Sequence, residues 1–206
     1  MVRKTKEEAE QTRNAILAAA LDVFCTKGYA RTTFDDIAAK INLTKGAVYW
    51  HFKNKPDLLI EVIKQNFYDN HCKIKEFANN IKNLEDLCEV QVKIAKMVVD
   101  DANYRRFLFF ARFHMEWSEG IVKTVGNAIR EIRDIPLKEL KELLTSFQKS
   151  GEIRPDLNVD DLALILMSLW QGMLSGVLSG GSELVRFPEM VRKSFGLMIK
   201  SIKNER

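Results

Sequence analysis

Apolar residues recur three and four positions apart along almost the whole chain of 206 residues, and runs of alternating β-branched residues are absent. This spacing gathers apolar side chains on one face of an α-helix, whereas a half-buried strand would require strict alternation. In the first such segment the apolar face consists of Ile16, Leu17, Ala20, Leu21 and Phe24. The sequence therefore predicts an all-α protein.

Capping residues divide this pattern into separate helices. Thr5 and Glu8 form a capping box at the start of the first helix, and Gly28 suits the left-handed conformation just after its end. Prolines and glycines separate the later helices. The expected helices cover residues 5–27, 34–41, 45–50, 54–77, 84–99, 102–118, 121–149 with a kink at Pro136, 158–179 and 187–203.

The net charge of +4 lies entirely near the start of the chain. Residues 1–56 carry 10 Lys and Arg against 6 Asp and Glu, whereas residues 57–206 carry 22 of each sign. A small basic segment joined to a neutral body is typical of nucleic-acid binding. Small charge imbalances are also common elsewhere, so the charge alone leaves the question open.

Two short helices with a tight turn between them follow the first helix. Thr33 caps the first of them and Thr44 the second, and Asn42 can take the left-handed backbone of the turn. Two short helices behind a longer supporting helix are the parts of a DNA-binding helix-turn-helix. The sequence thus predicts such a motif between Thr33 and Trp50.

The second short helix carries residues suited to the major groove of DNA. Gly46 and Ala47 are small enough for a close approach to the bases, and Ala47 can touch a thymine methyl group. Lys45 can donate to O6 or N7 of guanine. These three residues are candidate base contacts.

Phosphate contacts are expected around the same helix. The hydroxyls of Thr33 and Thr44 lie at helix N-termini, where free amides and the helix dipole favour an anion. The next turn adds donors on Tyr49, His51 and Lys55. In the alternative interpretation both threonines are only caps, and local core is formed by Tyr49, Trp50 and Phe52.

Over residues 3–62 the sequence closely resembles the DNA-binding domain of TetR-family regulators. The likeness rests on TTFDDIA at 32–38 and LTKGAVYWHFKNK at 43–55, and RKTKEEA at 3–9 is similar to the AcrR branch, which represses multidrug efflux genes. The resemblance implies a three-helix DNA-binding domain at 1–55 and a larger helical effector-binding and dimerisation domain at 56–206. It also implies DNA contacts by Thr33, Thr44, Lys45, Gly46, Ala47, Tyr49, His51 and Lys55, with Trp50 mainly supporting the short helix.

Members of this family are homodimers, and one short recognition helix offers few contacts by itself. Two such helices on a dimer can read half-sites about one turn, or ~34 Å, apart on a palindromic double-stranded operator. The last two large helices resemble the family's dimer seam. The expected seam residues are Leu169, Gly172, Met173, Gly176, Val191, Phe195, Met198 and Ile202.

The uncharged run from Leu162 to Ser182 has two interpretations. Its 21 residues are long enough to cross a bilayer, and its glycines at positions 172, 176 and 180 have the spacing found in packed membrane helices. Gln171 and four serines within the run favour instead a buried helix at a dimer seam. We expect the second arrangement, a protein without a membrane partner, and keep a membrane-anchored regulator as an alternative.

Residues 104–117 hold six of the 19 aromatic residues of the chain. They are either ordinary core or the wall of an apolar pocket for a small hydrophobic or cationic effector. The resemblance implies a repressor that such a ligand releases from DNA. The candidate pocket residues are Phe110, Phe113, His114, Trp117, Met167, Trp170 and Gln171.

Other classes of protein find little support in the sequence. Motifs for phosphate binding, nucleophilic hydrolysis and zinc proteolysis are lacking, so we expect no enzyme, no cofactor and no metal. The three cysteines are scattered and the start is charged at once, which favours a cytoplasmic protein without disulfides or a signal peptide. An architectural DNA-binding protein without effector control remains an alternative.

Overall fold

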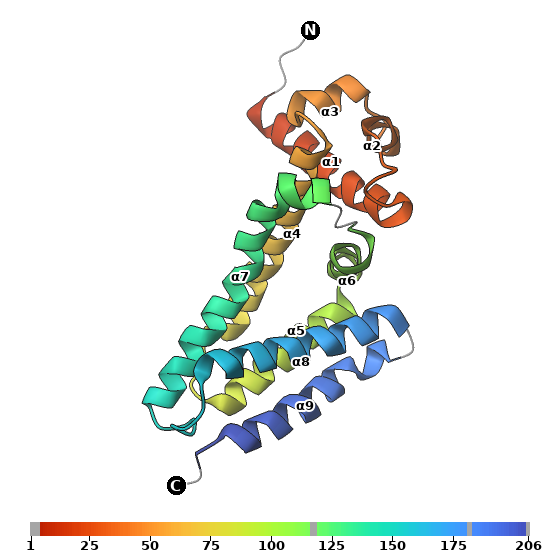
Figure 1. The fold of residues 1–206 in the computed structure, drawn as a ribbon. Coiled ribbons are helices and arrows are strands. Elements are labelled where there is room, and N and C mark those ends of the chain that lie inside the picture. The colour runs from red at the N-terminus through yellow and green to blue at the C-terminus, as the bar shows by residue number, and fades with distance from the viewer. Residues whose placement is uncertain (1–4, 116–118, 181–182, 205–206) are drawn as a thin grey trace. The chain divides into compact units, whose positions relative to one another are not determined.

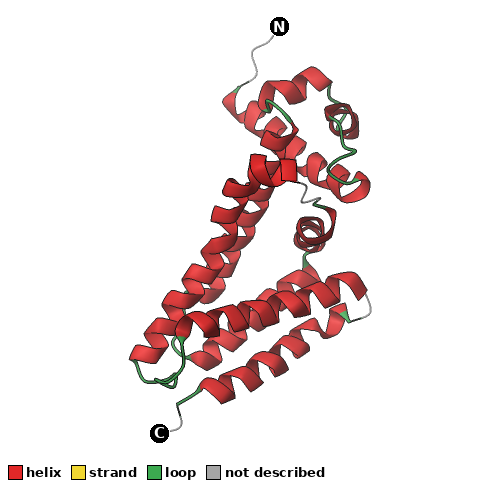
Figure 2. Ribbon diagram, viewed as in Figure 1, coloured by secondary structure: helices red, strands yellow, loops and turns green. Residues whose placement is uncertain are grey.

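The computed structural model describes residues 5–115, 119–180 and 183–204 (Figure 1). Helices joined by short loops make up these ranges, and they contain no strand (Figure 2). The prediction of an all-α protein is therefore confirmed. The helices are α1 (Lys6–Lys27), α2 (Phe34–Lys40), α3 (Lys45–His51), α4 (Lys55–Ala78), α5 (Leu84–Asp100), α6 (Ala102–Phe109), η1 (Phe110–His114), α7 (Glu119–Lys149), α8 (Val159–Gly180), η2 (Leu184–Arg186) and α9 (Phe187–Ile202).

The first helix begins and ends at the predicted signals. The Glu8 N–H donates to Thr5 Oγ1 at 3.2 Å, and the Thr5 N–H donates to Glu8 Oε2 at 2.8 Å, so the capping box is complete. Gly28 follows the last turn with a φ of 77°. A positive φ is costly for other residues, which explains why a glycine stands there.

The helix predicted over 102–118 differs from the structure. The α-helical part ends at Phe109, and Phe110–His114 form a π-helical turn, η1, after which the Met115 N–H donates to the Phe110 carbonyl at 3.0 Å. A π-turn holds one residue more than an α-turn, which a three-and-four pattern of apolar residues does not reveal. Residues 116–118 lie outside the described residues.

Pro136 lies inside α7, where the sequence suggested a kink. Proline has no N–H, so one helical hydrogen bond to the carbonyl four residues earlier is missing at this point. The helix nevertheless continues on both sides of the proline to Lys149.

The chain divides into two compact units. Unit 1 comprises residues 1–68 and 106–132, and unit 2 comprises residues 69–105 and 133–206. The long helices α4 and α7 each contribute to both units. The predicted functional division into residues 1–55 and 56–206 stays a prediction.

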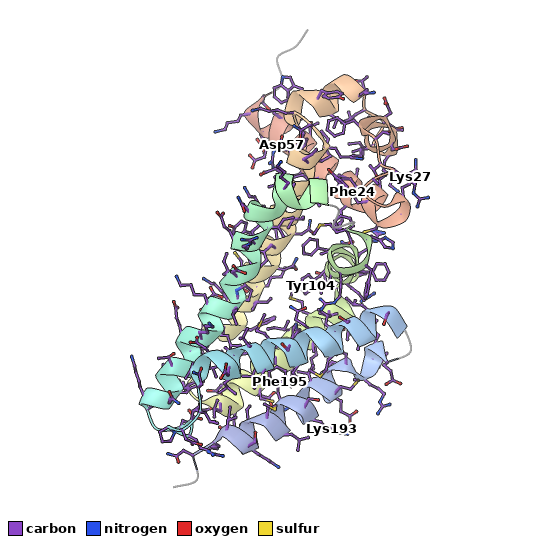
Figure 3. All side chains as sticks on the ribbon, viewed as in Figure 1. Phe24, Lys27, Asp57, Tyr104, Lys193 and Phe195 are labelled. Atoms are coloured by element: carbon purple, nitrogen blue, oxygen red, sulfur yellow. The ribbon has the colours of Figure 1, made fainter. Side chains whose placement is uncertain are left out.

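In unit 1, α1 packs against α2 and against η1, and α2 packs against α3. The centre is aromatic: Phe24 of α1 is fully buried (Figure 3), and its ring lies 5.5 Å from that of Phe110 in η1. Val48 of α3 and Phe52 just after it complete this core. The three N-terminal helices are thereby held as one body with the η1 turn.

In unit 2, α9 lies beside both α5 and α8 (Figure 1). Its apolar face is buried at Phe187, Val191 and Phe195, and the last of these is labelled in Figure 3. The end of α9 is tied down by an isolated bridge between Ile153 and Lys203. The C-terminal helix is therefore integral to the core of unit 2.

Candidate nucleic-acid interface

The turn between α2 and α3 is built on Asn42. This residue has a φ of 53°, the left-handed conformation predicted from the sequence. The next residue, Leu43, donates its N–H to the Ala38 carbonyl at 2.9 Å. The reversal is thus fixed by one unusual backbone angle and one hydrogen bond, and it sets α3 at an angle to α2.

The two predicted threonine caps are present. Thr33 Oγ1 accepts from the Asp36 N–H at 3.2 Å and donates its own proton to Asp36 Oδ2 at 2.8 Å. Thr44 Oγ1 accepts from the Ala47 N–H at 3.3 Å. The hydroxyl proton of Thr33 is therefore engaged within its own capping box, while Thr44 uses only its acceptor in the cap.

Helix α3 is anchored on one side and open on the other. Val48 is completely buried, whereas Lys45 and Gly46 are exposed and Ala47 is half-buried. The Tyr49 side chain remains 53% exposed even though its ring lies 4.8 Å from that of Phe34. The predicted base-reading residues thus share an outward surface of α3, held in place by Val48.

Lys45 forms an ion pair with α2. Its Nζ lies 2.7 Å from Asp35 Oδ2, so the pair connects the two helices of the motif. The hydrogen bond that Lys45 donates to Asp35 raises the pKa of the Lys45 ammonium, which keeps the lysine positively charged. A charged donor therefore stands at the start of α3.

Lys55 has a role that the sequence did not indicate. Its Nζ donates to the carbonyls of Tyr29, Ala30 and Thr32 at 2.9, 2.9 and 3.0 Å. An ammonium has three protons, and here all three are used within the chain. In this arrangement Lys55 fixes the loop before α2, and its contact with a phosphate stays a prediction. These carbonyls lie more than 20 positions earlier in the chain, so no local signal pointed to this role.

The position of Trp50 differs from the prediction made from the sequence. The sequence suggested that it supports the short helix, yet it is 72% exposed. It stands two positions after the buried Val48, and on a helix two positions amount to about 200°, the opposite side. That spacing was the signal that places Trp50 outward.

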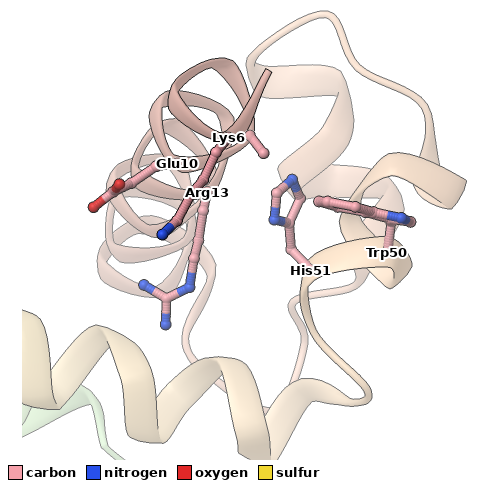
Figure 4. Close-up of a pocket in the computed structure, with 6 residues that line it drawn as sticks. Lys6, Glu10, Arg13, Trp50 and His51 are labelled. Carbon is pink, nitrogen blue, oxygen red and sulfur yellow. The ribbon is translucent and has the colours of Figure 1, made fainter. Parts of the chain in front are cut away.

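Trp50 borders an open hollow of about 370 Å³ between α1 and the end of α3 (Figure 4). The His51 ring lies 4.5 Å from that of Trp50 and points toward α1. Across the hollow, Arg13 pairs with Glu61 and lies over the Phe52 ring. The lining of the hollow therefore carries both charge signs beside the rings of Trp50 and His51. Its lining residues are Lys6, Ala9, Glu10, Arg13, Trp50 and His51.

Three of the candidate effector residues belong to unit 1. Phe110 is fully buried against Phe24, and His114 Nδ1 lies 3.0 Å from the Cys25 carbonyl oxygen. Phe113 is exposed over 43% of its surface and lies beside Phe109. Of these, Phe110 is a core residue in this structure. Trp117 lies outside the described residues.

The other three effector candidates belong to unit 2. The Trp170 ring lies 5.4 Å from that of Phe187 and 6.5 Å from that of Phe195, so it packs between α8 and α9. Met167 and Gln171 are half-buried on the same helix. The structure thus places the six described candidates in two different units, three in each.

The predicted dimer seam divides into buried and open residues. Val191, Phe195 and Ile202 are at most 4% exposed, because the chain's own helices cover them. A partner cannot contact these side chains, so this part of the seam was predicted wrongly. The stripe on α9 marks a covered face, and spacing does not say which helix covers it. Half-buried or exposed are Leu169, Gly172, Met173, Gly176 and Met198.

A broader open face runs along α8 and part of α9. Leu164 and Ile165 are about half exposed, and Leu197 of α9 is 70% exposed. An added Cβ at Gly172 or Gly176 would meet nothing within 4 Å. The outward side of α8 thus presents large apolar side chains, and no contact inside the chain requires the two glycines.

Helix α8 is also the one described helix whose length and apolar composition would allow it to cross a membrane. Within unit 2 it packs on α9 through a buried row on one side. This row contains Leu162, Ala163, Leu166, Leu174 and Val177. Length and composition alone do not separate such a core helix from a membrane span.

Titratable groups outside these regions form surface ion pairs. Among the described residues, no group of three or more His, Cys, Asp and Glu side chains is placed to hold a metal ion. Glu139 joins His71 and Lys75 at 3.2 and 3.0 Å, linking α7 to α4. These contacts of Glu139 therefore hold α7 and α4 together.

Comparison with known proteins gives a consistent result. Residues 16–62 match the family model described as bacterial regulatory proteins, tetR family. The transcriptional regulator AcrR of Shigella flexneri is 29% identical over 182 residues, covering 86% of this chain and 81% of AcrR.

Two solved structures share the fold. NalD, the secondary repressor of the MexAB-OprM multidrug efflux pump in Pseudomonas aeruginosa, has a TM-score of 0.78 at 20% identity, covering 97% of this chain and 99% of NalD. The SmeT–triclosan complex has a TM-score of 0.75 at 22% identity and covers 91% of both chains.

A helix-turn-helix on an N-terminal helical unit, with a recognition helix open to solvent, is the arrangement of DNA-binding transcriptional regulators, and the relatives compared above are regulators and not enzymes. Over residues 16–62 the chain resembles the TetR family of regulators, and its relatives include regulators of the AcrR type.

Proposed function

We propose that the protein is a repressor that binds a palindromic operator as a homodimer and leaves it when a small hydrophobic or cationic molecule binds. The observation that carries this proposal is the outward surface of α3, where Lys45, Gly46 and Tyr49 are exposed while Val48 anchors the helix. A recognition helix needs this combination of a fixed backbone and free side chains.

Gly46 adds an argument of its own. Glycine in a helix costs about 1 kcal/mol relative to alanine. An added Cβ at position 46 would meet only Thr44 Oγ1, at an ordinary 3.8 Å, so packing within the chain does not require the glycine. A close approach by a partner from outside, such as base edges in the major groove, accounts for it.

Dimerisation and the division of labour belong to the same proposal. Residues 1–55 bind DNA, and residues 56–206 bind the effector and form the dimer. The open face of α8 with Leu169, Gly172, Met173 and Gly176, together with Met198 on α9, is the seam. An apolar face of this kind needs cover, and a second copy also supplies the second recognition helix.

The effector acts by shifting an equilibrium. A coupling of about 1–3 kcal/mol is enough for a 5- to 150-fold change in operator affinity, and it must be reciprocal. The regulated genes are those of multidrug efflux, by analogy with AcrR-type relatives, and the protein works in the cytoplasm where its operator lies. The effector-contacting residues we propose are Phe110, Phe113, His114, Trp117, Met167, Trp170 and Gln171.

A gel-shift experiment tests the proposal. The DNA is the region upstream of the protein's own gene, with a scrambled duplex as competitor, and the added compounds are a panel of hydrophobic and cationic molecules that includes triclosan. We expect a preference for one palindromic site of at least about 10³ over scrambled DNA, and release by one class of compound.

Three results would contradict it. A preference far below 10³ would indicate an architectural DNA-binding protein. Equal compound affinity with and without operator would refute effector control, because coupling is reciprocal. Recovery of the untagged protein only with membranes would favour the anchored alternative.

Lys45→Ala tests the central contact. It should cost about 1–3 kcal/mol at one base position of each half-site and relax the preference there. An unchanged base-by-base affinity profile would remove Lys45 from the base contacts.

A further inference from the structure

We propose that Asp35 determines base specificity by holding the Lys45 ammonium at the DNA-facing end of α3, where it can donate to guanine. The proposal rests on the operator binding proposed above and adds to it a residue of α2 that touches no base. Asp35 is a positioning residue, acting through Lys45.

The contact is geometrically simple. Asp35 is the second residue of α2 and Lys45 the first residue of α3, and their side chains meet at 2.7 Å between Oδ2 and Nζ. The lysine side chain is 49% exposed and the aspartate side chain 63% exposed. The pair therefore lies on the surface, beside the outward face of α3.

The neighbouring carboxylate shows what Asp35 does not do. Asp36 accepts from the N–H and the hydroxyl of Thr33 and pairs with Lys27, so it completes the cap of α2. Asp35 takes no part in this cap: among the described residues its side chain pairs with Lys45. Asp35 also lies in the first turn of α2, where a carboxylate interacts favourably with the helix dipole, but it takes no part in the cap hydrogen bonds.

The pair contributes little to stability, since exposed ion pairs are worth about 0–1 kcal/mol. Its effect is on the conformation of Lys45. An ammonium has three protons, and one donated to Asp35 leaves two for the O6 and N7 acceptors of guanine. Fixing a four-carbon side chain before binding lowers the entropy lost when the complex forms.

The ion pair between Asp35 and Lys45 also disfavours DNA sequences that lack a guanine at this position. Where no guanine is present, Lys45 gains no base contact in its held position. Turning to a phosphate would leave the Asp35 carboxylate unpaired beside the negatively charged backbone. Specificity commonly arises from such a penalty on the wrong partner as well as from contacts with the right one. Asp35 thus lowers affinity for DNA in general and raises the preference for guanine at one position.

The test is a base-by-base affinity profile of the operator for wild type, Asp35→Ala, Asp35→Glu, Lys45→Ala and the double variant. Asp35→Ala should reduce the preference for guanine at the Lys45 position by roughly two- to fivefold per half-site, the range of an exposed ion pair. It should also bind scrambled DNA more tightly. Asp35→Glu should restore part of the preference, because the charge is retained.

The double variant separates positioning from a general charge effect. In the Lys45→Ala background, Asp35→Ala should no longer change the preference at that position. Glu189→Gln is the matched control: it also removes one exposed, lysine-paired negative charge, on α9 in unit 2, and should leave the profile unchanged. Thermal unfolding of each variant verifies that it is folded.

Two results with the Asp35 variants would overturn the role of Asp35 and leave operator binding in place. These are an Asp35→Ala profile identical to wild type, or an equal loss of preference with and without Lys45. A wild-type protein with no base preference would refute the operator binding itself, and the role of Asp35 with it. A Glu189→Gln effect equal to that of Asp35→Ala would also overturn the proposal, since net charge would then explain both.

Discussion

The aromatic rings of Phe24 and Phe110 are stacked, with centroids 5.5 Å apart and an angle of 15° between their planes. Phe24 lies in α1, which supports the helix-turn-helix, and Phe110 begins the π-helical turn after α6. Both side chains are fully buried. Within unit 1, this pair fastens the η1 turn to the helix that carries the DNA-binding motif.

Phe110→Ala should therefore lower the free energy of unfolding by about 3–5 kcal/mol, the usual cost of removing a buried aromatic ring. Phe113→Ala is the matched control, because the Phe113 side chain is 43% exposed and should cost about 1 kcal/mol or less. Urea unfolding followed by circular dichroism measures both. Equal losses in the two variants would show that the stacked pair is not the stabilising contact.

Lys55→Ala should destabilise the protein by about 1–3 kcal/mol, because three carbonyls lose their charged donor. Lys53→Ala removes the same charge from an exposed position nearby and should leave stability near wild type. For the folded variant we expect an unchanged salt dependence of DNA binding. A slope reduced by about 0.9 per protomer would instead indicate a phosphate contact by Lys55.

Gly176→Leu should yield a monomer that no longer binds the operator. The glycine is exposed, and an added Cβ would meet nothing within 4 Å, so the chain itself tolerates a side chain there. Gly176→Ala is the control, since it adds only a methyl group and favours the helix. Light scattering gives the mass in solution. A Gly176→Leu protein that remains dimeric and folded would remove this face of α8 from the seam.

Asp36 should make stability depend on pH in the acid range. Hydrogen bonds from Lys27 and Thr33 lower its pKa from 3.8 to about 2. A carboxyl group with a lowered pKa in the folded state contributes stability above its unfolded pKa, and this contribution is lost as the pH falls through the folded pKa. The loss is thus expected between about pH 4 and pH 2.

Asp36→Asn should flatten the pH dependence in that window, as measured by thermal unfolding at a series of pH values. Asp69→Asn, at an exposed position of α4, should leave the wild-type dependence in place. The role of Asp36 would be refuted by parallel curves for Asp36→Asn and wild type.

Much of the helix-turn-helix could be predicted because its determinants are local. Thr33 and Thr44 cap helices through their own neighbours, and Asn42 sets the turn by its own backbone angle. Residue type and position are sufficient for such features. The contacts of Lys55 could not be predicted in this way, because they depend on carbonyls more than 20 positions away.

The apolar faces illustrate a different limit. The row of Val191, Phe195 and Ile202 correctly marks a covered side of α9, yet the cover is the chain itself. The spacing of apolar residues along a helix indicates which side of the helix is buried. It does not indicate which other helix or subunit covers that side. Trp50 shows the converse: its aromatic character suggested core, whereas its angular distance from Val48 placed it outside.

The π-helical turn at Phe110–His114 has a consequence for comparing related chains. Such a turn amounts to one inserted residue in an α-helix. Deleting one residue from it would tighten the turn and rotate the residues after the deletion, up to Met115, by about 100° relative to Phe110. The number of residues in this turn is therefore as important for its contacts as the aromatic side chains are. Homologues with one residue fewer here should lack the contact between His114 Nδ1 and the Cys25 carbonyl oxygen.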